Sequence, residues 1–182
     1  DLPEPTRTTP PPNSLLAQEA SGVAYNYDTQ TLFIVADGGT SIVQVSKSGA
    51  LINSMTMALG SNPEGREFYD TEGITYVGNG KFVMVEERDR QLVLFTYVAG
   101  TTLTRAAAQT VKLGTFASNT GIEGLTYDPI TSGFICVKEK TPMGIFQTNV
   151  DFINGTATNG SATTQNSINL FNPALTGFTD MA

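Results

Sequence analysis

Ser21-Gly22-Val23-Ala24-Tyr25 recurs as Glu72-Gly73-Ile74-Thr75-Tyr76 and again as Glu123-Gly124-Leu125-Thr126-Tyr127, each copy 51 residues after the one before. The Gly and the Tyr keep their places in all three copies. Each copy is followed by a turn and then by an apolar run of strand length, with further short runs behind it. Short strands at a fixed period of about fifty residues are typical of propeller blades.

The units agree beyond this motif. The later strands of each unit are expected at 32–35, 42–45 and 54–57, at 82–85, 92–95 and 110–113, and at 134–137, 145–147 and 167–170. Turn residues at 28–30, 78–80 and 128–133 separate the first two strands of each unit. A β-sandwich is the alternative, but it gives no reason for an equal repeat.

We therefore predict an all-β propeller of about three four-stranded blades, at residues 19–69, 70–120 and 121–178, behind a Pro-rich segment at residues 1–18. Asp180-Met181-Ala182 matches the opening of a fourth unit. Three blades do not close a ring, so we expect the chain to be a fragment. Its open edge is then a candidate for self-association.

Composition excludes several function classes. Of 182 residues, 40% are hydrophobic, and the net charge of -7 argues against nucleic acid as a partner. No apolar run is long enough for a membrane span. The absence of His excludes Ser-His-Asp catalysis and His-based zinc sites. The single Cys136, within an apolar run, is expected to be a buried structural thiol.

The chain resembles the SdiA-regulated protein family of exported propellers. The resemblance runs from about residue 19 to the last residue, and its further matches are Asp70-Thr71-Glu72, Val85-Glu86-Glu87-Arg88-Asp89, Gly121-Ile122-Glu123 and Val137-Lys138-Glu139-Lys140. It implies a ring of five or six blades and a secreted or periplasmic location, and it supplies no established substrate. The polar, Pro-rich start, residues 1–12, is also typical of the region after a cleaved export signal.

A second acidic position recurs after the second strand of each unit. Asp37 follows Gly22 by fifteen residues, Glu87 follows Gly73 by fourteen, and Glu139 follows Gly124 by fifteen. Counting from the turns places Glu72 opposite Glu87 and Glu123 opposite Glu139 at the open end of each hairpin. Because the first strand of a blade lines the channel, these ends converge on one rim. The candidate metal ligands are Glu19, Asp37, Glu72, Glu87, Glu123 and Glu139.

Like charges held together need compensation. A hard cation such as Ca²⁺ is one answer, because it prefers several oxygen ligands. A raised pKa on one carboxylate, as in an acid–base pair, is another. The third interpretation is structural: the acids accept backbone N–H bonds from the next blade, or form ion pairs with Arg88, Arg90, Lys138 and Lys140.

Three functions remain open. The first is a binding module whose rim holds calcium and an unknown small-molecule or polymer ligand. The second is a metal-dependent hydrolase of phosphoesters or lactones that uses the same carboxylates. The third is a purely structural or interaction propeller. The sequence assigns no catalytic residue, and fold analogy does not choose among the three.

Overall fold

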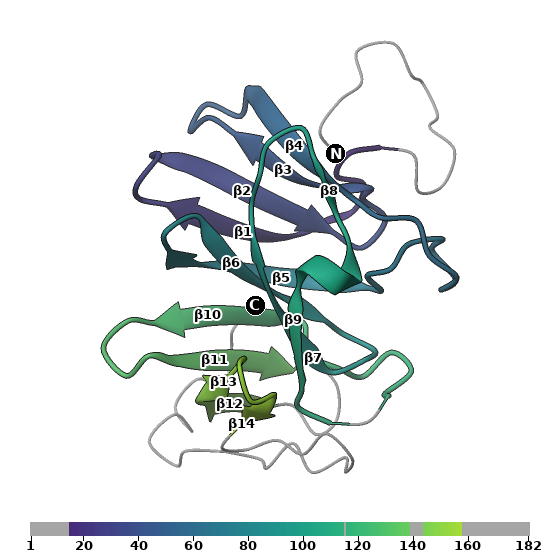
Figure 1. Ribbon diagram of the computed structural model, residues 1–182, viewed down its shortest axis with the longest axis vertical. Coiled ribbons are helices and arrows are strands. Elements are labelled where there is room, and N and C mark those ends of the chain that lie inside the picture. Colours follow the sequence, from purple (N-terminus) through teal and green to yellow (C-terminus); the bar gives the residue numbers. More distant parts are fainter. Residues whose placement is uncertain (1–14, 115, 139–143, 158–182) are drawn as a thin grey trace.

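The computed structural model describes residues 15–114, 116–138 and 144–157, and its regular structure is almost entirely β-strand. Three main sheets follow one another along the chain, and we call them blades 1, 2 and 3 (Figure 1). Blade 1 contains β1 (Ala20–Asn26), β2 (Thr31–Ala36), β3 (Ser41–Val45) and β4 (Leu51–Met57). Blade 2 contains β5 (Thr71–Gly78), β6 (Lys81–Glu86), β7 (Gln91–Thr96) and β9 (Gln109–Lys112). Blade 3 contains β10 (Gly124–Asp128), β11 (Gly133–Lys138) and β12 (Gly144–Thr148).

Within each blade, consecutive strands pair antiparallel, as the repeat predicts. The hairpin turns use backbone conformations with positive φ: Gln30 (57°), Asn79 (54°), Gly80 (71°) and Ser132 (55°). Such turns match the twist of the paired strands. The all-β propeller fold predicted from the sequence is therefore confirmed.

The first strands of the three blades, β1, β5 and β10, lie side by side, and the motif glycines explain how closely. A Cβ on Gly22 would lie 2.8 Å from the Cα of Gly73, and a Cβ on Gly73 would lie 3.0 Å from the backbone N of Leu125. Any side chain at these positions would push two blades apart. The Gly of the repeat is thus a contact residue between blades.

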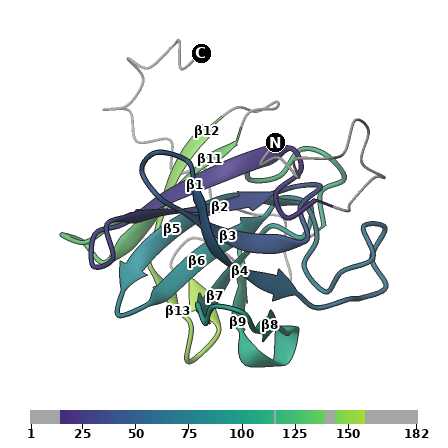
Figure 2. The same ribbon diagram turned by 90° about the horizontal axis from the view of Figure 1, so that it is seen from above.

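Hydrophobic side chains fill the spaces between blades. Between blades 1 and 2, the rings of Phe33 and Phe82 have centroids 4.4 Å apart, and Tyr76 packs beside them. Between blades 2 and 3, a second cluster includes Phe134 and the fully buried Cys136. Figure 2, seen from the blade 1 side, shows blade 1 lying over the other two. Apolar burial of this kind is the main force that holds blades together.

One connection departs from the predicted pattern. After β7 the chain leaves blade 2, and we call residues 97–108 the crossing arm. The arm contains β8 (Thr102–Leu103) and a 3₁₀ turn, η1 (Arg105–Ala107), before the chain returns as β9. β8 pairs in parallel with β4, so blade 1 has a fifth strand supplied by the unit of blade 2. The prediction of four strands in each blade did not include this exchange of β8 between blades.

Blade 3 is described in part. The strand expected at 167–170, the motif at 180–182 and Glu139 lie outside the described residues. After β12, the short strands β13 (Val150–Asp151) and β14 (Thr156–Ala157) form a separate hairpin. No helix within the described ranges has the length and apolar character needed to cross a membrane.

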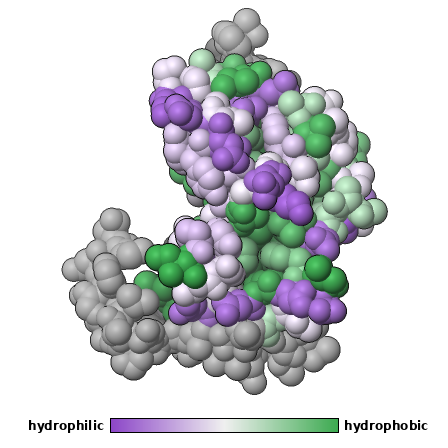
Figure 3. All heavy atoms as spheres, turned by 60° about the vertical axis from the view of Figure 1, so that its left-hand side comes forward, coloured by the Kyte–Doolittle hydropathy of each residue, from purple (hydrophilic) through white to green (hydrophobic). Residues whose placement is uncertain are grey.

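The two ends of the strands differ in character. Figure 3 looks at the molecule from the left-hand side of Figure 1, where the turns between the first two strands of each blade lie, and shows hydrophobic residues gathered in the middle of that face. The opposite end, where β2 and β6 finish and β5 begins, carries Asp37, Asp70 and Glu87.

Candidate cation site

Five carboxylates gather where blades 1 and 2 meet, and we call them the acidic cluster: Asp37, Glu64, Asp70, Glu72 and Glu87. They form two overlapping triplets that share Asp70. Carboxylate oxygens of Asp37, Glu64 and Asp70 lie within 4.8 Å of one another, and the same holds for Asp70, Glu72 and Glu87. Asp70 is therefore the centre of the arrangement.

The loop between β4 and β5 brings Glu64 and Asp70 into place. Asn62 organises it, because its Oδ1 accepts hydrogen bonds from the backbone N of Glu64 (2.9 Å) and of Arg66 (3.1 Å), while its Nδ2 donates to the carbonyl of Phe68 (3.0 Å). Side-chain amides are well suited to such turns because they mimic backbone partners. The loop is thus built locally, without a counterpart in the repeat.

Asp70 is buried and held from several sides. Its backbone N donates to Glu64 Oε2 (3.2 Å), and its carbonyl accepts from the backbone N of Glu87 (2.8 Å). Its carboxylate accepts a hydrogen bond from Arg88 Nε in a salt bridge. These contacts fix Asp70 relative to both triplets.

The Glu87 side chain contacts both the third unit and the acidic cluster. It is 2% exposed, and its Oε1 accepts a hydrogen bond from the backbone N of Gly121 (2.9 Å), at the start of the third unit. This is the bond between units that the structural interpretation of the acids predicted. Glu87 nevertheless also belongs to the second triplet, so one carboxylate both joins two units and faces the acidic cluster.

Burial and mutual repulsion change the proton affinity of the cluster. Burial, followed by the neighbouring carboxyl of Asp70, raises the pKa of Asp37 to about 8 and that of Glu87 to about 8. Burial and the charges of nearby acids raise the pKa of Glu72 to about 7. Burial would also raise the pKa of Asp70, but hydrogen bonds from Glu87, Arg88 and Asp37 outweigh it and hold that pKa below its usual value. The cluster therefore keeps protons at neutral pH unless a cation replaces them.

Two arginines neutralise part of the charge. Arg66 Nη2 donates to Glu64 Oε2 (2.8 Å) and to the carbonyl of Asp37 (2.7 Å), and Arg88 pairs with Asp70. With every group ionised, five carboxylates and these two guanidiniums leave three negative charges. Arg90, which is close enough for its charge to interact with Glu87, offsets a further part. The cluster remains electronegative.

After the excess negative charge, the Arg66 side chain is a second indication that the site is suited to a ligand. Its side chain is 3% exposed, and its Nε and Nη1 have no hydrogen-bond partner among the described residues. Buried donors of this kind are rarely left without an acceptor. These two atoms are therefore able to donate to an acceptor that the described residues do not supply, such as a water or a ligand oxygen.

The structure brings only some of the predicted metal ligands together. Asp37, Glu72 and Glu87 belong to the triplets. Glu123 is half-buried and belongs to neither triplet, although its charge raises the pKa of Glu72 and Glu87. Glu19 is exposed and outside both triplets, and its carboxylate lies beside Gly38. Glu139 falls outside the described residues.

The predicted register was wrong in detail. Thr71 pairs with Glu86 and Gly73 with Val85, with irregularities at 71–73 and at 76–78, so Glu72 does not lie directly opposite Glu87. Their carboxylates meet because the bulge turns Glu72 toward Asp70, which is a property of bulges near functional sites. Sequence reasoning missed Glu64 and Asp70 as ligands. Asp70 was visible in the recurring Asp70-Thr71-Glu72, whereas Glu64 has no repeat counterpart.

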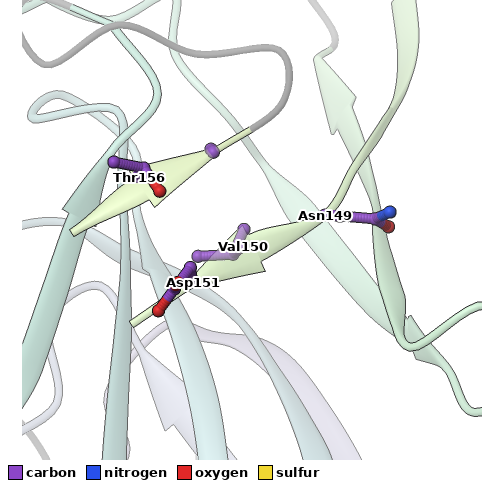
Figure 4. A pocket seen from close by; sticks show the side chains of 5 residues that line it. Asn149, Val150, Asp151 and Thr156 are labelled. Carbon is purple, nitrogen blue, oxygen red and sulfur yellow. The ribbon is translucent and has the colours of Figure 1, made fainter. Parts of the chain in front are cut away.

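Two other candidates carry no comparable chemistry. Burial raises the pKa of the Cys136 thiol to about 12, so it is the structural thiol that the sequence predicted. A hollow of about 280 Å³ beside the β13–β14 hairpin is lined by Asn149, Val150, Asp151, Thr156 and Ala157 (Figure 4). The Asp151 carboxylate there already accepts hydrogen bonds from the backbone N of Ile153 (2.9 Å) and of Asn154 (3.0 Å). This hollow is separate from the acidic cluster.

Comparisons with known proteins agree with this fold. The family model for SdiA-regulated proteins matches residues 10–178. A glutaminyl cyclase from Myxococcus xanthus superposes with a TM-score of 0.50 at 16% identity, over 72% of this chain and 55% of that one. A virginiamycin B lyase from Staphylococcus aureus superposes with a TM-score of 0.43 at 12% identity, over 72% of this chain and 41% of that one. The chain thus spans about half the length of these structures, and similarity at this level concerns the fold alone.

Proposed function

We propose that this chain, which belongs to the SdiA-regulated family, is an exported binding module whose acidic cluster holds a divalent cation, with calcium preferred. The observation that carries the proposal is the convergence of four carboxylates around a fifth, Asp70, with two guanidiniums in salt bridges to them among the described residues. A divalent ion would neutralise most of the remaining charge. It would also take the place of the protons that Asp37 and Glu87 otherwise retain.

The donor set fits a hard cation. All five side chains offer oxygen, and the separations of up to 4.8 Å between oxygens within each triplet suit an ion that binds each oxygen at about 2.3–2.6 Å. Calcium also accepts irregular geometry and six to eight ligands, which this mixture of loop and strand residues can supply only in part. Water or a ligand oxygen would complete the shell. A chain without His and with its one Cys buried offers no softer alternative at the site.

The cation would give the module its ligand specificity. A partly filled coordination shell selects for hydroxyl, carboxylate or phosphate oxygens, as found on sugars and acidic polymers. The nearby Arg66 has two donors without an acceptor among the described residues, and these donors are suited to the water or oxygen that accompanies such a ligand. Extracellular calcium modules work with dissociation constants of about 10⁻⁴–10⁻³ M, and an exported protein would meet calcium in that range.

A hydrolase is the second candidate, and the Glu72 carboxyl is the observation that favours it. Its pKa of about 7 is close to the value that suits a general base near neutral pH. In such an enzyme Glu72 would accept a proton from an attacking water on a phosphoester or lactone. A screen of generic esters, lactones and phosphoesters with calcium present separates the two functions, because a binder gives no turnover above the Glu72→Gln variant.

The first test is thermal unfolding of the chain in excess EDTA and then with added calcium. A ligand at one hundred times its dissociation constant stabilises the folded state by about 2.7 kcal/mol, which raises the midpoint by about 5–10 °C for a domain of this size. Asp37→Asn and Glu72→Gln each replace one carboxylate, in the first and in the second triplet respectively, by a neutral amide that is a weaker calcium ligand. We expect each to weaken calcium binding, as measured by titration calorimetry, and the larger loss identifies the triplet that holds the ion.

Asp89→Asn is the matched control. It removes one negative charge near the site, but Asp89 lies outside the acidic cluster and pairs with Lys112 (3.9 Å). Its calcium affinity should equal that of the wild type. A folded wild-type chain whose midpoint does not respond to millimolar calcium would overturn the proposal, and would leave the acids as links between blades.

A further inference from the structure

The crossing arm carries one side chain, Arg105, that contacts the loop leading to the acidic cluster. Arg105, in η1, projects from the arm into the loop between β4 and β5. Its Nη2 donates to the carbonyl of Glu67 (2.6 Å), and its backbone N donates to the Glu67 carboxylate. Its guanidinium also stacks on the Phe68 ring, 4.3 Å from the centroid. The arm thus holds the middle of the loop that carries Glu64 and Asp70.

The same guanidinium binds a buried acid of blade 2. Arg105 Nη2 and Nη1 donate to Glu86 Oε1 (2.7 Å) and Oε2 (2.8 Å) in a forked salt bridge. The Glu86 carboxylate is fully buried and also accepts from the backbone N of Tyr69 (2.7 Å) and from Gln91 Nε2 (2.6 Å). Forked arginine–carboxylate pairs are rigid as well as strong.

These contacts fix the stretches that carry three members of the acidic cluster. The held segment 67–69 lies between Glu64 and Asp70, and Phe68 at its centre is fully buried in the core between blades. Glu87 directly follows Glu86. Arg105 itself touches none of the five carboxylates, so its influence on them passes through the loop and through Glu86.

We infer that Arg105 is a positioning residue for the cation site, an inference that rests on the proposed function. Carboxylates brought together without a cation repel one another, and a loose loop would let Glu64 and Asp70 separate. The forked bond between the arm, the loop and β6 opposes that separation before an ion enters. Groups that hydrogen-bond directly to metal ligands typically contribute about 10–100-fold to metal affinity, and Arg105 acts one step further out, through the loop and Glu86, so we expect a smaller contribution.

The test compares Arg105→Lys, Arg105→Met and a control, Phe134→Leu, which disturbs the core between blades 2 and 3 away from the loop. Calcium affinity is measured by titration calorimetry well below each midpoint of unfolding. We expect a loss of about 5–10-fold for Arg105→Met, a smaller loss for Arg105→Lys because it keeps the charge but not the fork, and less than about twofold for the control. Equal losses in all three variants would show a general effect of stability and overturn the inference.

Hydrogen exchange without calcium gives a readout that does not depend on cation binding. Amides of residues 64–70 should exchange faster in both Arg105 variants than in the wild type, and should be unchanged in Phe134→Leu. Unchanged exchange in the Arg105 variants would overturn the inference even if the wild type binds calcium. Faster exchange in a chain that binds no calcium would overturn the proposed function but leave the role of Arg105 in holding the loop.

Discussion

Glu86 and Glu87 are neighbours in the chain, both are buried, and their surroundings are opposite. Glu86 is surrounded by donors: both terminal nitrogens of Arg105, the amide of Gln91 and a backbone N–H. Glu87 has one backbone donor at Gly121 and otherwise faces other acids, which with burial raise its pKa to about 8. Successive residues at the end of a strand point to different sides, so one step along the chain separates these two environments.

The difference shows how burial alone fails to identify a functional acid. A buried carboxylate whose lone pairs are filled by protein donors is complete and has no need of a ligand. A buried carboxylate among other carboxylates is incomplete, and only a proton or a cation can complete it. Glu86 therefore belongs to the framework, and Glu87 belongs to the site.

The largest effect expected from this comparison is on stability. Glu86→Gln leaves the Arg105 guanidinium without its counter-charge, and because Arg105 is 31% exposed we expect a cost of about 2–3 kcal/mol, at or below that of breaking a fully buried pair. Glu87→Gln should leave the free energy of unfolding in EDTA at pH 7 unchanged or raise it, because Gln mimics the protonated carboxyl that the folded state favours and needs no bound proton. Urea denaturation of both variants measures the difference. Equal costs would mean that Glu87 is as fully structural as Glu86.

The second effect is a dependence of stability on pH. Without a cation, Asp37, Glu72 and Glu87 have folded-state pKa values raised to about 8, 7 and 8, whereas an unfolded carboxyl titrates near 4. Between these pH values the folded chain binds more protons than the unfolded chain, so stability falls as the pH rises above about 4 and levels off above about 8. We expect a loss of roughly 2 kcal/mol between pH 5.5 and 9, less than the separate shifts suggest because the groups titrate together.

Calcium should reverse this trend, because it binds the deprotonated cluster. Unfolding curves at each pH, in EDTA and in calcium, should diverge most above pH 8. Glu87→Gln should flatten the EDTA curve, whereas Asp89→Asn should leave it unchanged. Stability that rises with pH in EDTA would contradict the raised pKa values on which the contrast with Glu86 depends.

The smallest effect concerns Glu123, which tests how far the electronegative region extends toward blade 3. Its charge raises the pKa of Glu72 and Glu87 without contributing to either triplet. Glu123→Gln should lower both pKa values by a few tenths of a unit, so that the loss of stability in EDTA levels off at a lower pH and the chain is about 0.5 kcal/mol more stable near pH 8. A loss of calcium affinity beyond about tenfold would instead identify Glu123 as a ligand.

The sequence predicted the fold well because the fold is repetitive. Three copies of one motif located the first strands, and the motif Gly proved to be the point of closest approach between blades, as at Gly22 and Gly73. The crossing arm was not predictable in this way. Its strand β8 has no counterpart in the other units, and parallel pairing with β4 depends on the placement of blade 1 beside blade 2.

The site was predictable only in part. Spacing within the repeat found Asp37 and Glu87, because both follow the second strand of their units. It could not find Glu64, which a single Asn62-centred loop brings to Asp70. Two bulges in the β5–β6 hairpin, which no spacing rule reveals, replaced the expected Glu72–Glu87 pairing with a shared contact at Asp70.

The pairing of β8 with blade 1 also affects how the chain unfolds. Unfolding of blade 1 breaks the pairing between β4 and β8, and β8 belongs to the unit of blade 2. It also exposes the aromatic core that the two blades share. Within the described ranges, no strand of the third unit enters the sheet of blade 2. We therefore expect the units of blades 1 and 2 to unfold together, as one cooperative unit, under denaturing stress.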